Sequence, residues 1–92
     1  MVTAVVLIKA ATDKVTDLAE QLAELDGVSE VFSVAGQYDL VALVRVRENE
    51  DLARVISDRV RKLPGINGSE TLIAFKVYSK QDLEAGFALG LD

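Results

Sequence analysis

Two four-residue segments that match in sequence and in position constrain the fold of this chain more than any other feature. Leu25-Asp26-Gly27-Val28 and Leu63-Pro64-Gly65-Ile66 each follow apolar residues at helical spacing and precede a predicted strand. Glycine commonly ends a helix because it adopts the left-handed backbone conformation without a steric penalty. Each half of the chain is therefore predicted to carry a helix that ends at a glycine and leads into a strand.

Four segments are predicted to form strands because they are rich in β-branched and apolar residues. These segments are residues 2–9, 28–35, 38–47 and about 70–78. A tight turn at Gly36-Gln37 separates the second segment from the third, so these two strands should form a hairpin.

Two helices are predicted between the strands, since apolar residues recur there every three or four positions. The first helix carries Val15, Leu18, Ala19, Leu22 and Leu25, and the second carries Leu52, Val55, Ile56, Val60 and Leu63. Thr12 or Asp13 is the expected N-cap of the first helix and Asn49 that of the second, because such side chains accept hydrogen bonds from free amides.

The element order β-α-β-β-α-β defines the split βαβ, or ferredoxin-like, arrangement of the α+β class. Both helices should then pack on one face of a four-stranded antiparallel sheet. A capping box at residues 79–82, followed by Leu83 and Phe87, predicts a short C-terminal helix as well. No linker of proline, glycine and serine divides the chain, so residues 1–92 are expected to form a single domain.

The sheet face that the helices leave open is also predicted to be apolar. A face exposed to water requires strands that alternate apolar and polar residues. The first and third strands are apolar on both faces instead, with Val5 and Leu7 opposing Val2, Ala4, Val6 and Ile8, and Val41 and Leu43 opposing Leu40, Ala42, Val44 and Val46. Apolar patches of this size are seldom exposed on a monomer. We expect a second copy of the chain to cover this face, which gives a sheet-to-sheet homodimer, the dimeric α+β barrel. The alternative cover is the C-terminal helix.

Composition argues against several classes of function. The 92 residues include no cysteine and no histidine, which removes disulfides, thiolate metal sites, the usual metal ligand and the usual general base. A net charge of −5 argues against nucleic-acid binding. The sequence contains no P-loop, G-x-G-x-x-G or G-x-S-x-G motif. We expect no catalytic residues, metal or cofactor, and a protein that is not an enzyme.

The apolar N-terminus does not predict a membrane segment. Lys9 interrupts it, and the run is much shorter than the ~20 residues that a membrane span requires. A cytoplasmic location is expected.

Four basic residues make the second helix positive on its outer side: Arg54, Arg59, Arg61 and Lys62. The simpler interpretation of these residues is a solvated surface with ion pairs to Asp58 or Glu50.

Gly36-Gln37-Tyr38-Asp39 is the most distinctive short segment. A glycine and a polar residue are ordinary in a hairpin, but a carboxylate beside the apolar residues 40–44 is unfavourable unless it has a partner. Asp39 could cap the amides of its own turn, or it could receive the ammonium group of a ligand.

Two stretches resemble the effector domain of Lrp/AsnC regulators, also called the RAM module (regulation of amino-acid metabolism). They are Val34-Ala35-Gly36-Gln37-Tyr38-Asp39-Leu40, and Pro64-Gly65-Ile66 leading to Ser69-Glu70-Thr71. The resemblance implies that an amino acid, or a related small molecule, binds between homodimers of a larger ring, an octamer or similar. It also implies the ligand-binding residues, with Ser69 in place of the family's first threonine: Gly36, Gln37, Tyr38, Asp39, Ser69 and Thr71.

Full-length regulators of this family carry a helix-turn-helix domain ahead of the module, whereas this chain begins at the first strand. It therefore resembles the stand-alone module, and neither a helix-turn-helix domain nor direct DNA binding is expected. Modulation of transcription or metabolism would then act through self-assembly or through full-length, DNA-binding Lrp/AsnC relatives.

Two other classes of protein share this topology. Small dimeric α+β barrel enzymes, such as cofactor-free monooxygenases and isomerases, commonly place a histidine, a tryptophan or a polar cluster in their cavity. This chain has no histidine or tryptophan. ACT-like modules also bind amino acids on a βαββαβ frame, but they are usually fused to an enzyme. The leading hypothesis is an amino-acid-binding regulatory module.

Overall fold

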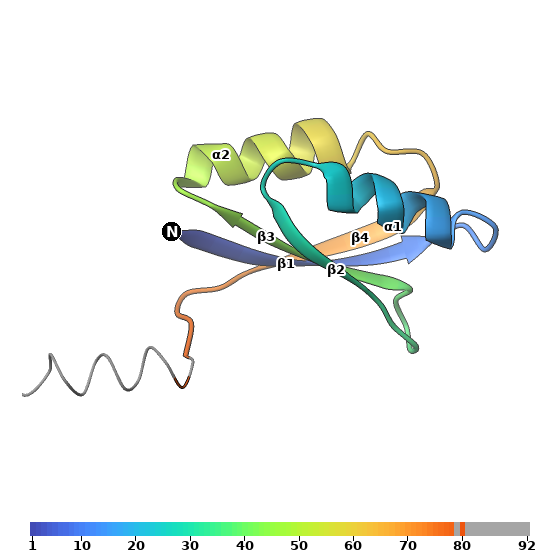
Figure 1. Cartoon of the computed structure of the whole chain (residues 1–92), viewed down its shortest axis with the longest axis horizontal. Coiled ribbons are helices and arrows are strands. Elements are labelled where there is room, and N and C mark those ends of the chain that lie inside the picture. Colours follow the sequence, from blue (N-terminus) through green and yellow to red (C-terminus); the bar gives the residue numbers. More distant parts are fainter. Residues whose placement is uncertain (79, 81–92) are drawn as a thin grey trace, which may run out of the picture.

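The computed structural model describes residues 1–78 and 80, and its elements follow the predicted order (Figure 1). The strands are β1 (Val2–Ala10), β2 (Val28–Ser33), β3 (Leu40–Val46) and β4 (Ile66–Ile73). The helices are α1 (Val15–Glu24) and α2 (Asn49–Ala53), and α2 continues directly as the π-helix η1 (Arg54–Val60). The predicted C-terminal helix at Leu83 and Phe87 lies outside the described residues.

The four strands form one antiparallel sheet in the order β2-β3-β1-β4. β1 lies in the middle, paired with β3 on one side and with β4 on the other. Both helices cover the same face of this sheet (Figure 1). The α+β class and the ferredoxin-like arrangement are therefore confirmed.

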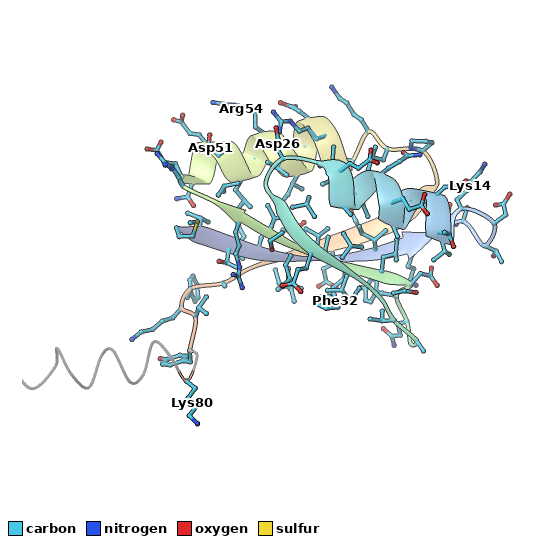
Figure 2. All side chains as sticks on the ribbon, in the orientation of Figure 1. Lys14, Asp26, Phe32, Asp51, Arg54 and Lys80 are labelled. Carbon is cyan, nitrogen blue, oxygen red and sulfur yellow. The ribbon has the colours of Figure 1, made fainter. Side chains whose placement is uncertain are left out.

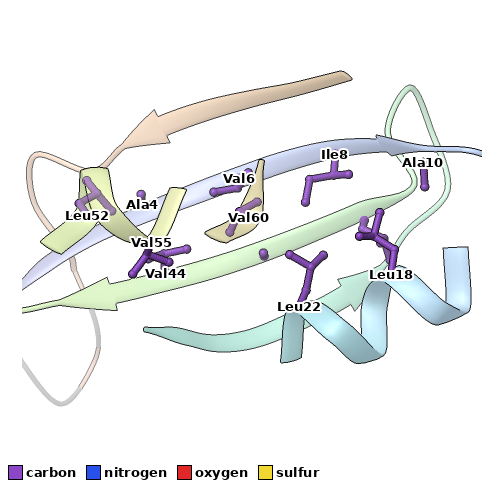
Figure 3. Packing of buried hydrophobic residues seen from close by; sticks show 12 residues of the cluster. Ala4, Val6, Ile8, Ala10, Leu18, Leu22, Val44, Leu52, Val55 and Val60 are labelled. Atoms are coloured by element: carbon purple, nitrogen blue, oxygen red, sulfur yellow. The ribbon is translucent and has the colours of Figure 1, made fainter. Parts of the chain in front are cut away.

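The core lies between the helices and the sheet (Figure 3). β1 and β3 direct alternate side chains into it, and the helices supply the rest. Its fully buried large members are Val6, Ile8, Leu18, Leu22, Leu40, Val44 and Val60. Burial of a valine or leucine side chain contributes roughly 1.5–3 kcal/mol, so this single layer accounts for much of the stability of the fold.

Each turn between a helix and the next strand contains the predicted glycine, but the helices end earlier, α1 at Glu24 and η1 at Val60. The backbone angle φ is +94° at Gly27 and +95° at Gly65. A Cβ atom at Gly27 would lie 2.8 Å from Cγ2 of Val55, and one at Gly65 would lie 2.8 Å from Cβ of Lys14. The two junctions thus require glycine both for backbone conformation and for close packing against a neighbouring element.

The π-helix η1 keeps apolar side chains against the sheet. Leu52, Val55 and Val60 are buried, and Ile56 packs against the same core. The wider π-helical turn shifts the register, so Val60 is fully buried while Arg59 is exposed. In η1 the side chains of Val55 and Val60, five positions apart, are both buried.

The two predicted N-caps are wrong. α1 follows Lys14, whose amide donates to the carbonyl of Ala11 in a turn, and no side chain caps the helix. Asn49 is the first residue of α2, and the carbonyl of Glu48 accepts the amides of Asp51 and Leu52 instead. In both cases backbone carbonyls take the place of a side-chain cap.

The predicted boundaries of β4 are also wrong. The strand spans Ile66–Ile73 rather than about residues 70–78. Its length is set by β1, since the pairing runs from Ala10 opposite Ile66 to Ala4 opposite Ile73. The amide of Ala74 adds one bond to the carbonyl of Thr3, and the ladder with β1 ends there.

The sheet face away from the helices is apolar. Residues that pair directly across strands share a face, so the registers place one set of apolar side chains there: Val5, Leu7, Phe32, Val41, Leu43 and Leu72. We call this set the open face. Phe32 is 43% exposed and projects from the side opposite the helices (Figure 2). The predicted two-sided apolar pattern is present, and within the described residues no helix covers the open face.

Candidate functional site

Residues 34–39 connect β2 to β3 in a loop that is longer than the predicted two-residue turn. The amide of Val34 donates to the carbonyl of Asp39 at 2.9 Å and closes the loop. Gly36 and Gln37 are exposed, whereas Tyr38 and Asp39 are half-buried. The hairpin is confirmed, and its tip presents backbone and polar groups to the solvent.

Asp39 is fixed to the end of β1. Its amide donates to the carbonyl of Ile8 at 2.9 Å, and its Oδ2 accepts the amide of Ala10 at 2.9 Å. The pairing of β1 with β4 shifts register between Lys9 and Ala10. The carboxylate thus binds a backbone amide at a bulge of the neighbouring strand, rather than the amides of its own turn.

Tyr38 connects the loop to β4 across the open face. Its hydroxyl donates to Oε2 of Glu70 at 2.7 Å, and Nζ of Lys9 lies 5.8 Å from the centroid of its ring. The hydrogen bond to Glu70 is the main cause that raises the pKa of the Tyr38 phenol above its ordinary value. Sequence reasoning named neither Glu70 nor Lys9 as a site residue, although Glu70 stands between Ser69 and Thr71.

Ser69 and Thr71 lie on the other face of β4. They pair with Ile8 and Val6, whose side chains belong to the core, so both hydroxyls are on the helix side of the sheet. Glu70 pairs with Leu7 and lies on the open face. Within one chain the six predicted ligand residues therefore form two groups, the hairpin loop between β2 and β3 and the β4 hydroxyls on the helix side of the sheet.

The two hydroxyls line a hollow of about 560 Å³ beside β4, which we call the β4 hollow. Its other lining residues are Ile56, Arg61, Ile66, Asn67 and Gly68. The hydroxyls, the Asn67 amide and the Arg61 guanidinium are hydrogen-bond donors of the kind that bind a carboxylate. Arg61 and Asn67 were not predicted as site residues, and the only sequence signal for Arg61 was its place in a basic run.

The hollow adjoins an edge of the sheet, because β4 is the last strand in the order. Among residues 1–78 and 80, no cluster of acidic side chains could hold a metal ion. The same part of the chain contains no helix with the length and apolar character needed to cross a membrane. The fold and the hollow together define a small α+β domain with a polar hollow at its edge.

Comparison with known families identifies this class of domain. Residues 3–83 match the family model of the Lrp/AsnC ligand binding domain. The chain therefore belongs to the Lrp/AsnC family, and it is a regulatory ligand-binding domain of that family.

The relatives agree with this assignment. The transcriptional regulator FL11 of Pyrococcus horikoshii is 30% identical over 77 residues, which cover 84% of this chain and 50% of FL11. The crystal structure of TTHA0845 from Thermus thermophilus is 46% identical, with a TM-score of 0.82 over 87% of this chain and all of TTHA0845. The chain spans about half the length of the curated relatives that it matches, which are named as transcriptional regulators.

A more distant structure shares the fold. The transcriptional regulator NMB0573 from Neisseria meningitidis, solved as a complex with L-Met, is 15% identical, with a TM-score of 0.74 over 85% of this chain and 52% of NMB0573.

Proposed function

We propose that this domain binds an α-amino acid and that binding changes its assembly or its association with DNA-binding relatives. The observation that carries the proposal is the β4 hollow, where Ser69, Thr71 and Arg61 supply several donors around one concave site. An amino acid presents a carboxylate to such donors, and Ile56 and Ile66 offer apolar contacts to its side chain. The L-Met complex of NMB0573 supports this class of ligand for the shared fold.

The ammonium group of the ligand requires an acceptor, and we assign that role to Asp39. Its Oδ2 accepts the Ala10 amide, while Oδ1 makes no hydrogen bond within the described residues. The hairpin loop joins β2 and β3, whereas the hollow lies beside β4, with β1 between them in the sheet, so we propose that the ligand bridges two protomers. This arrangement supports a site between subunits, lined by Gly36–Asp39 of one protomer and by Ser69 and Thr71 of its neighbour.

The proposal therefore includes self-assembly. Homodimers would form through the open face, and dimers would stack into a ring, an octamer or similar, in which the hairpin of one subunit meets the β4 hollow of the next. We place the protein in the cytoplasm, without catalytic activity. Any effect on transcription would pass through full-length Lrp/AsnC relatives, because the net charge of −5 disfavours direct DNA binding.

A thermal-shift screen of the twenty amino acids tests the ligand class. A ligand at a hundred times its Kd adds about 2.7 kcal/mol of stability, which raises the Tm of a domain this small visibly. For an amino acid that raises the Tm, Asp39→Asn should weaken binding roughly 10- to 100-fold, because one charge-assisted hydrogen bond is lost. Ser69→Ala should weaken it too.

Ser33→Ala is the matched control, since Ser33 is an exposed strand hydroxyl that lies on neither the loop nor the hollow. The affinity of the Ser33→Ala variant for the amino acid should equal that of the parent chain. If none of the twenty amino acids raises the Tm, or if Asp39→Asn and Ser69→Ala both bind with unchanged affinity, the proposed site is wrong.

A further inference from the structure

Four of the five arginines of the chain line one pocket, at the opposite end of β3 from the hairpin. This hollow of about 300 Å³ lies between the α1–β2 junction, the end of β3, and the helix formed by α2 and η1. Its arginines are Arg45, Arg47, Arg54 and Arg59. We call it the arginine pocket. Such a concentration of positive charge is unexpected in a chain whose net charge is −5.

The π-helix brings two of these arginines together. Arg54 and Arg59 are five residues apart, and in an α-helix their side chains would point about 140° away from each other. Bonds from residue i to i+5 define a π-helix, as in the 3.0 Å bond from the amide of Arg61 to the carbonyl of Ile56. In η1, residues five apart are therefore about one turn apart, and both arginines line the same pocket.

The close approach of the α1–β2 junction to η1 forms one wall of the pocket. Gly27 lines it, and a Cβ at this position would lie 2.8 Å from Cγ2 of Val55, which also lines it. Asp26 precedes the glycine, and its backbone carbonyl accepts a 3.4 Å hydrogen bond from Nη1 of Arg59. Figure 2 shows Asp26, Asp51 and Arg54 on the helix side of the molecule.

The charges around the pocket do not balance. Two aspartates, Asp26 and Asp51, line it beside the four arginines, which leaves an excess of two positive charges. Asp51 forms a 3.5 Å ion pair with Arg54, instead of the predicted pairing through Asp58 or Glu50. Within residues 1–78 and 80, neither Arg45 nor Arg47 makes an ion pair or a side-chain hydrogen bond.

We infer that the arginine pocket binds a small molecule through a phosphate or diphosphate group. A guanidinium presents paired donors whose geometry matches two phosphate oxygens, and a dianion would neutralise the excess charge of the pocket. A concave site of about 300 Å³ favours a compact group over an extended polymer. The pocket is separate from the β4 hollow, so this ligand would be a second input to the domain, independent of an amino acid.

Titration of the full chain with inorganic pyrophosphate at constant ionic strength tests the inference, with amide NMR shifts as the readout. We expect saturable binding, with the largest shifts at Gly27, at Arg47 and across η1. Arg59→Gln and Arg47→Gln should each weaken binding about 10-fold, because each removes a charge-assisted contact. Two arginines are substituted separately, so that if one variant misfolds, the other still tests the inference.

Lys62→Gln is the matched control, since it removes the same charge from an exposed residue outside the pocket. Its pyrophosphate affinity should stay within about twofold of the parent value. Three results would overturn the inference: no saturable binding at millimolar pyrophosphate, equal weakening in Lys62→Gln, or variants that keep their affinity but change the oligomeric mass. The last result would make the pocket a contact between subunits.

Discussion

At the scale of single residues, the contacts that matter join positions far apart in the sequence. Asp39 binds the amide of Ala10, 29 residues earlier, and Tyr38 binds Glu70, 32 residues later. Both contacts depend on which strands are neighbours and in which register. Both contacts lie at the hairpin that we assign to the ligand site. Asp39 and Tyr38 therefore each have a structural role, and experiments must distinguish the loss of that role from the loss of ligand binding.

Asp39→Ala should lower the free energy of unfolding by about 1–3 kcal/mol, because the amide of the buried Ala10 loses its acceptor. Asp39→Asn keeps an acceptor oxygen and should lower it by less than about 1 kcal/mol. Urea unfolding measures both. Asp58→Ala is the control, since this exposed aspartate should change stability by less than about 0.5 kcal/mol. Equal stability of Asp39→Ala and the parent would show that the bond to Ala10 contributes nothing.

Tyr38 should ionise at a higher pH than an ordinary tyrosine, because its hydrogen bond to Glu70 favours the protonated phenol. A raised pKa stabilises the fold below the ordinary tyrosine pKa, and this contribution is lost as the pH rises through the folded-state value. Absorbance titration of the ionised phenol in a Tyr78→Phe background isolates Tyr38. Glu70→Gln should lower its pKa, and an unchanged titration curve in that variant would contradict the assignment.

At the scale of elements, local sequence signals were sufficient to predict the order of the helices and strands. They were not sufficient to predict the residues at which each element begins and ends. Periodicity predicted four strands and two helices, but neither helix ends at its glycine: α1 ends at Glu24 and η1 at Val60, before Gly27 and Gly65. The bounds of β4 were not predictable locally, because β1 sets them through pairing. The π-helix was missed because Leu52, Ile56 and Val60 recur every four positions, as they would in an ordinary α-helix. The predicted ligand residues stay a prediction, and the sequence did not indicate that Ser69 and Thr71 lie on the helix side of the sheet while Glu70 lies on the open face.

Gly27→Ala should lower the free energy of unfolding by about 1–3 kcal/mol. The new side chain would occupy a left-handed conformation, and its Cβ would lie 2.8 Å from Val55 in η1. Gly68→Ala is the control, because no atom lies within 4 Å of a Cβ there. Chemical denaturation of the two variants compares them directly. If both lose the same stability, the close approach of the α1–β2 junction to η1 is not a constraint on the fold.

At the scale of the whole molecule, two features favour the proposed assembly. The open face has apolar side chains from all four strands, and β1 separates the two halves of the proposed ligand site, which lie at the β2–β3 loop and beside β4. Covering a few hundred Å² of apolar surface is worth several kcal/mol at about 25 cal/mol per Å². A second copy of the chain can cover the open face, and further copies can complete the proposed ligand site. A single assembly would therefore bury the open face and form the site together.

Light scattering should therefore report a mass of at least twice the 9.9 kDa of one chain at micromolar concentration. Leu43→Arg places a charge at the centre of the open face, where Leu43 pairs with Val5. Burial of that charge against a second sheet has no compensating partner, so the variant should shift toward the mass of one chain. Ala23→Arg is the matched control, because Ala23 lies exposed on α1 and should leave the mass unchanged. A parent chain of 9.9 kDa, or a Leu43→Arg variant of unchanged mass, would place the subunit contact elsewhere.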